Sequence, residues 1–86
     1  MSTAETTIRL AAPVDAARIA ALYSQLLPNT GVRVLPERIA DLARDPNTGL
    51  FVSEAGGGVC GTALVSLCAD VMFGFQPFAV LENVVV

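Results

Sequence analysis

The sequence predicts a small α/β domain of the α+β type, in which two helices cover a mixed, mostly antiparallel sheet in the order β-α-α-β-β-β. Two stretches with apolar residues at helical spacing follow a short alternating segment. Three consecutive glycines separate two strand-like stretches, and residues 78–86 are the most strand-like in the chain. The 86 residues allow one domain at most, so residues 1–86 are treated as part of a single domain.

The first two elements are a strand and a helix. Thr6–Leu10 alternates in polarity, which is typical of a short strand. Pro13 stands where the first turn of a helix tolerates proline, and Asp15 follows where a carboxylate complements the helix dipole. We therefore expect a helix over residues 13–27, ended by the Pro-Asn-Thr-Gly sequence at 28–31. Its buried stripe would consist of Ile19, Leu22, Tyr23 and Leu26.

A second helix is predicted to begin at Pro36, with a buried stripe of Ile39, Leu42 and Ala43. It should end before Asp45, because a residue that precedes proline is disfavoured in the helical region.

A hairpin follows, with strands over Gly49–Ala55 and Val59–Val71 joined by the glycines at 56–58. Both faces of the second strand are small or apolar, which predicts a strand covered on both sides. One face would carry Gly61, Ala63, Val65, Leu67 and Ala69, and the other Cys60, Thr62, Leu64, Ser66 and Cys68.

Cys60 and Cys68 lie in the same predicted strand, about 26 Å apart, too far for a disulfide. We expect buried, reduced thiols. The sequence contains no histidine, which removes the commonest activator of a catalytic cysteine and a common metal ligand, so no metal site is predicted.

Composition excludes two classes of partner. Five basic residues, all arginine, stand against eight acidic ones without forming a basic patch, which argues against nucleic-acid binding. The chain is 53% hydrophobic, with a mean hydropathy of +0.62, yet no apolar run reaches the ~18 residues of a membrane span. This hydrophobicity predicts faces that something else covers. Met1–Thr7 lacks the features of a secretory signal, so we expect a cytoplasmic protein.

The order of elements, with these residues, resembles the N-terminal half of the GNAT superfamily of N-acetyltransferases. The matching segments are Ile8–Leu22 (IRLAAPVDAARIAAL), Leu50–Leu64 (LFVSEAGGGVCGTAL) and Phe78–Val86 (FAVLENVVV), and the LENVVV ending is the most specific of them. The resemblance implies transfer of an acetyl group from acetyl-CoA to a primary amine of a small molecule or peptide.

In that family the fourth strand leads into a helix start with an Arg/Gln-x-x-Gly-x-Gly/Ala signature, which binds the pyrophosphate of the cofactor. This sequence stops before such a signature, with three valines in mid-strand. We therefore expect a truncated chain that is inactive by itself and binds acetyl-CoA weakly. The glycines at 56–58 precede a strand and are interpreted as a hairpin turn.

The resemblance also implies roles for individual residues. The backbone amides of Val84 and Val86 would face the thioester oxygen and the pantetheine arm, although these residues are alternatively core valines paired in a sheet. Glu82 is the one charge in its strand; apolar neighbours would desolvate its carboxylate and make it a stronger base for the ammonium substrate. A solvent-facing structural glutamate is the alternative. Asn83 would point to the opposite face.

The turn at 72–77 contains Phe73 and Phe75, which would either wall an apolar acceptor site or pack the turn. A different class of function is a non-catalytic GNAT-like module that acts through self-association. In that case the strand over residues 78–86 would pair with another copy, or else it would contact a missing C-terminal half.

Overall fold

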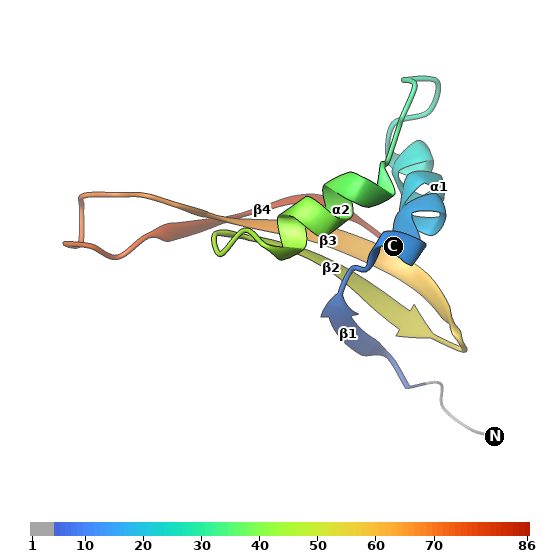
Figure 1. Ribbon diagram of the computed structural model, residues 1–86, viewed down its shortest axis with the longest axis horizontal. Helices are drawn as coiled ribbons and strands as arrows, with labels where there is room; N and C mark the ends of the chain where they lie inside the picture. The colour runs from blue at the N-terminus through green and yellow to red at the C-terminus, as the bar shows by residue number, and fades with distance from the viewer. Residues whose placement is uncertain (1–4) are drawn as a thin grey trace.

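The computed structural model describes residues 5–86 and has the predicted α+β architecture. A four-stranded antiparallel sheet, in the order β1-β2-β3-β4, carries two helices on one face (Figure 1). The elements are β1 (Thr7–Leu10), the 3-10 turn η1 (Pro13–Asp15), α1 (Ala16–Leu26), α2 (Pro36–Ala43), β2 (Thr48–Ala55), β3 (Gly58–Cys68) and β4 (Phe78–Val85). Of the segment examined for a secretory signal, residues 1–4 lie outside the described range.

The predicted first helix divides into η1 and α1 because its first turn is held by a side chain. The carboxylate of Asp15 accepts a hydrogen bond from the Ala12 amide at 2.7 Å, and the Asp15 amide donates to the Ala12 carbonyl at 2.8 Å. Asn29 and Gly31 adopt left-handed backbone angles, with φ of 62° and 70°, and turn the chain toward α2. The bounds of α2 agree with the prediction.

The core lies between the helices and one face of the sheet. Its most buried side chains are Ile19 and Leu22 from α1 and Val52 from β2, each at most 1% exposed. Two residues expected in the helix stripes are exposed: Leu26 at 44%, and Ala43. Both stand at the C-terminal end of their helix.

An ion-pair network joins β1 to the start of the helical layer. Asp15 is only 6% exposed, and its carboxylate accepts hydrogen bonds from two Arg9 nitrogens, at 2.8 and 2.9 Å. Arg9 also pairs with Glu54 of β2. The guanidinium holds the pKa of Asp15 below its usual value, and the two carboxylates raise the pKa of Arg9.

Two bulges interrupt the strands, and the sequence pattern did not predict them. On β3, Gly61 is opposite Ser53 but Val59 is opposite Glu54, so Cys60 is an extra residue. The Cys60 sulfur therefore lies 3.5 Å from the Ser53 hydroxyl oxygen, which corrects the expected face alternation along β3. Both cysteines are free, and they are half-buried where buried thiols were expected.

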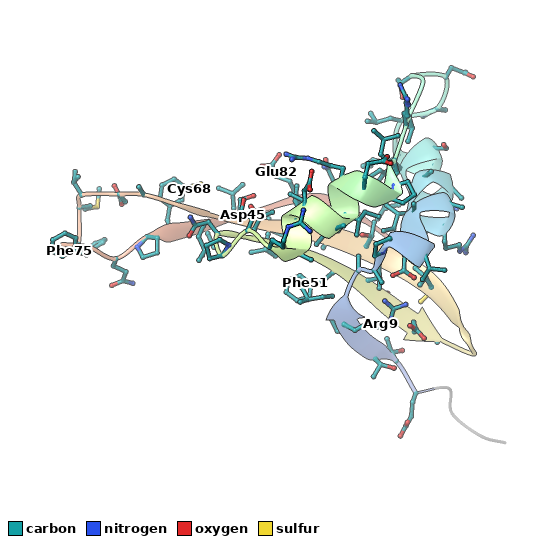
Figure 2. All side chains as sticks on the ribbon, viewed as in Figure 1. Arg9, Asp45, Phe51, Cys68, Phe75 and Glu82 are labelled. Carbon is teal, nitrogen blue, oxygen red and sulfur yellow. The ribbon has the colours of Figure 1, made fainter. Side chains whose placement is uncertain are left out.

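The prediction that β3 is covered on both sides is wrong for the described residues. The helices cover one face alone, and Phe51 projects from the other (Figure 2). Directly opposite residues share a face, so Leu10, Phe51 and Ala63 lie together on this uncovered side. We call it the open face. Its exposed apolar side chains include Ile8 (64%), Leu10 (55%), Leu67 (45%) and Leu81 (63%).

Neither helix in residues 5–86 has the length and apolar character needed to cross a membrane. Within the same residues, cysteine and carboxylate side chains form no cluster able to hold a metal ion.

Candidate functional site

The residues that the sequence nominated for chemistry lie on β4, at one edge of the sheet. β4 pairs with β3 on one side, and among residues 5–86 no strand pairs with its other side. Glu82 is opposite Leu64, and Val85 is opposite Thr62. Two β4 residues, Asn83 and Val84, therefore span the interval that one β3 residue, Ala63, occupies.

This extra residue forms a β-bulge, and Asn83 supplies its unusual backbone angle. Asn83 has a φ of 53°, in the left-handed region that asparagine enters more readily than most residues. A bulge leaves a residue outside the regular ladder and bends the strand. Asparagine is depleted in strands, so its presence inside an otherwise β-branched segment was the signal available in the sequence.

A small polar cluster packs beneath the bulge. Tyr23 of α1 belongs to the core layer, as predicted, and burial raises the pKa of its phenol above the usual value. The neighbouring polar groups of Thr62 and Asn83 oppose that rise. Asn83 therefore lies on the side of the sheet that carries the helices. In a regular strand, Asn83 and its neighbour Glu82 would point to opposite sides, but the left-handed backbone angle of Asn83 breaks this alternation. Thr62 is 5% exposed, and its hydroxyl donates to the Phe51 carbonyl at 2.9 Å.

Glu82, Val84 and Val86 are all exposed. The exposure of Glu82 means that the desolvation expected from its apolar neighbours is absent in residues 5–86. Val84 is 49% exposed and Val86 is 89% exposed, so neither side chain is the core valine of the alternative interpretation. The half-buried valine of this stretch is Val85.

Phe73 and Phe75 do not pack the turn, since they are 69% and 105% exposed. They stand at the tip of the long β3–β4 hairpin, and Figure 2 shows Phe75 at the end of that arm, well away from Glu82. The described residues therefore do not place the two rings as a wall around an acceptor near Glu82.

An apolar depression on the open face borders the bulge. Its volume is about 180 Å³, and Ile8, Phe51, Gly61, Val84 and Val86 are among its lining residues; we call it the β4 groove. A Cβ on Gly61 would come within 2.6 Å of the Ser53 hydroxyl oxygen and 3.2 Å of the Val85 carbonyl oxygen, so only glycine fits there without a shift.

A second cavity of about 220 Å³ lies on the covered face between the helices and the sheet. Its lining includes Ile39, Leu42 and Leu64, together with two arginines, Arg33 and Arg38. It borders α1 and α2, whereas the β4 groove borders the bulge.

No family model matches the chain, and no curated protein matches it. Among solved structures, the chain is similar to one titled "Putative acetyltransferase from Agrobacterium tumefaciens str. C58", with a TM-score of 0.78 and 26% identity. The match covers 93% of this chain and 58% of that chain, so the protein described here spans less than two thirds of the length of the solved structure. The two helices and four antiparallel strands of the chain described here match a GNAT-like half domain. The chain therefore has an acetyltransferase-like fold.

Proposed function

We propose that this chain is part of a GNAT-type N-acetyltransferase, which transfers the acetyl group of acetyl-CoA to a primary amine of a small molecule or peptide. The observation that carries the proposal is the bulge at Asn83 and Val84, beside an apolar groove, in a fold similar to that of an acetyltransferase. A bulge frees backbone groups from the ladder, and acyl transfer needs a free hydrogen-bond donor for the carbonyl oxygen, which supports the proposal.

The proposed chemistry uses the β4 amides as donors. When the amine nitrogen attacks the thioester carbon, negative charge develops on the carbonyl oxygen, and a fixed N–H donor stabilises it. The amide of Val84 would serve this oxygen, and the amide of Val86 would hold the pantetheine arm. The carbon–nitrogen bond forms, the carbon–sulfur bond breaks, and coenzyme A leaves as a thiolate that takes up the proton lost from the amine.

Glu82 is proposed to accept the proton of the ammonium substrate, directly or through water. Glu82 is exposed and lies opposite Leu64, on the side of β4 that faces the helices, so water would carry the proton to it from an amine at the open-face groove. In residues 5–86 the glycine-rich turn joins β2 to β3 and does not begin a helix, so it does not have the form of a pyrophosphate site. The part of acetyl-CoA that the described residues would bind is therefore the thioester arm.

The test is a titration of the isotope-labelled chain with S-acetylpantetheine, followed by amide chemical shifts. We expect saturable shifts at Asn83 to Val86 in the millimolar range, because this probe carries the thioester arm without the phosphates. Acetyl-CoA should shift the same amides, whereas adenosine 3′,5′-bisphosphate should not.

The chain offers a matched pair of variants. Asn83→Val should abolish the shifts, because a β-branched residue is strongly disfavoured at positive φ. Asn29→Val is the control, since Asn29 has a similar φ of 62° in the loop after α1, far along the chain from the bulge. Shifts that survive Asn83→Val, or that lie away from β4, would contradict the proposal.

A non-catalytic, self-associating module is the second candidate, and it is favoured by the outer side of β4, which pairs with no strand among residues 5–86.

A further inference from the structure

We propose that the cavity between the helices and the covered face of the sheet binds a small carboxylate with an apolar body. The apolar lining of the cavity would take the body, and Arg33 and Arg38 would pair with the carboxylate. This site is separate from the β4 groove, and the proposal needs neither acetyl-CoA nor catalytic activity.

The cavity exists because the two helices rest on different strands. α1 packs on β3 and β4, whereas α2 packs on β2 and η1, and both helices lie on the same face of the sheet (Figure 1). The space that they leave between them has a volume of about 220 Å³, and every residue that lines it lies within residues 19–64.

The floor of the cavity belongs to the two inner strands. Leu50 of β2 and Leu64 of β3 are directly opposite each other, and both line the cavity. Within the sheet, β2 pairs with β1 and β3, and β3 pairs with β2 and β4. The cavity is therefore a feature of the interior of this sheet and not of its β4 edge.

The walls are apolar, and the volume suits a small organic molecule. Ile19 of α1 is 0% exposed and Ile39 of α2 is 3% exposed, and both line the cavity together with Leu42. In another protein, an engineered apolar cavity of about 150 Å³ binds benzene. A volume of about 220 Å³ therefore admits a phenyl ring with a short alkyl chain.

The two arginines supply the charge that selects the ligand. Arg33, in the loop before α2, forms no ion pair within residues 5–86. Arg38, in the first turn of α2, lies 4.0 Å from Asp41, whose carboxylate Arg44 already holds at 2.7 Å. Both guanidinium groups at the cavity therefore have N–H donors free for an anion, and their planar fork matches a carboxylate.

A single negative charge fits the site better than two. Glu37 and Asp41 stand on the same helix as Arg38, so they offset part of the positive charge and disfavour a doubly charged phosphate. Arg33 and Arg38 are exposed, so the carboxylate can keep contact with water while the apolar body is buried. A purely apolar ligand would leave the arginines unused, and a small inorganic anion would leave the cavity unfilled.

Titration of the isotope-labelled 86-residue chain with 3-phenylpropionate tests the proposal. We expect saturable chemical shift changes at the methyl groups of Ile39, Leu42 and Leu64, with a dissociation constant in the millimolar range, as is usual for a ligand of this size. Nuclear Overhauser contacts should join the phenyl ring to the same methyl groups. The neutral analogue 3-phenylpropionamide should bind ~10-fold more weakly, and acetate should cause no saturable change at these methyl groups.

The chain offers matched arginine variants. Arg33→Gln and Arg38→Gln should each raise the dissociation constant of 3-phenylpropionate by ~5-fold, and since both side chains are exposed the fold should not change. Arg44→Gln is the control, because Arg44 is 73% exposed against 69% for Arg38 and pairs with the same Asp41, but does not line the cavity. Its dissociation constant should stay within a factor of about two of the unchanged chain.

Four results would each overturn the proposal. These are the absence of saturable changes at about 20 mM ligand, changes confined to the open face, equal affinity for the acid and its amide, or an effect of Arg44→Gln as large as that of Arg33→Gln. The titration with S-acetylpantetheine reports on the opposite face of the sheet, so the failure of either proposal is distinguishable from the failure of the other.

Discussion

Replacing Asp15 by asparagine should destabilise the fold through the loss of one buried charge. The Asp15 carboxylate is 6% exposed and accepts three hydrogen bonds: two from Arg9, at 2.8 and 2.9 Å, and one from the Ala12 amide, at 2.7 Å. Asparagine keeps the shape and one acceptor oxygen, so the Ala12 amide can stay satisfied. The variant Asp15→Asn therefore removes the charge and leaves the turn intact.

The magnitude follows from these contacts. Hydrogen bonds to charged groups contribute ~1.5–3 kcal/mol each, but the Arg9 side chain is 38% exposed and partly solvated, which reduces the gain. We expect a loss of ~2 kcal/mol in the free energy of unfolding near neutral pH, a large part of the stability of so small a domain. The assay is urea unfolding followed by circular dichroism, with the fluorescence of Tyr23, the single tyrosine, as a second probe.

The sign of the pH dependence makes this prediction specific. Arg9 lowers the pKa of folded Asp15, so the folded state favours the ionised carboxylate more than the unfolded chain does. The stabilisation is present above the unfolded value of ~3.9 and disappears as pH falls through the folded value. The gap between the unchanged chain and Asp15→Asn should therefore close in acid. A gap that is the same in acid and near neutrality, or that is below ~0.5 kcal/mol throughout, would refute the reasoning.

Three further predictions concern the core, the groove and the chemistry. Ile19→Ala should lower the free energy of unfolding by ~2–4 kcal/mol, while Val71→Ala, at a side chain 91% exposed, should change it by less than ~0.5 kcal/mol; urea unfolding compares them. Gly61→Ala should cost ~1–3 kcal/mol because its Cβ would meet the Ser53 hydroxyl oxygen at 2.6 Å, and Ser53→Gly should recover part of that loss in the same assay; full additivity would contradict this. In a catalytically active form of the protein, Glu82→Gln should lower kcat by ~100-fold and remove the acidic limb of the pH–rate profile, and an unchanged profile would return Glu82 to a structural role.

The order of the elements could be predicted because local signals define it. Proline at positions 13 and 36 marks two helix starts, and the glycines at 56–58 mark the hairpin. The periodicity that predicted Ile19 and Leu22 as core residues reports a helix face, which needs no knowledge of the partner. Each of these signals acts over a few residues.

The bulges and the open face could not be predicted in this way. A bulge depends on which residues of two strands face each other, and this register is fixed by the whole sheet. Strict alternation therefore placed Cys60 and Asn83 on the wrong sides. Likewise, apolar residues on both faces of β3 show that both faces avoid water, but they do not show which elements cover them. For the same reason the exposure of Glu82, on which its chemistry depends, followed from the structure alone.

The central claim is that the β4 bulge, in an acetyltransferase-like fold, presents backbone donors to a thioester. The most direct test is an intermolecular nuclear Overhauser measurement between the acetyl methyl group of S-acetylpantetheine and the isotope-labelled chain. The account predicts contacts from this methyl group to the side chains of Val84 and Val86, which line the β4 groove, and their loss in Asn83→Val. Two results would contradict it: contacts confined to the cavity between the helices and the covered face of the sheet, or a probe that touches no β4 residue at millimolar concentration.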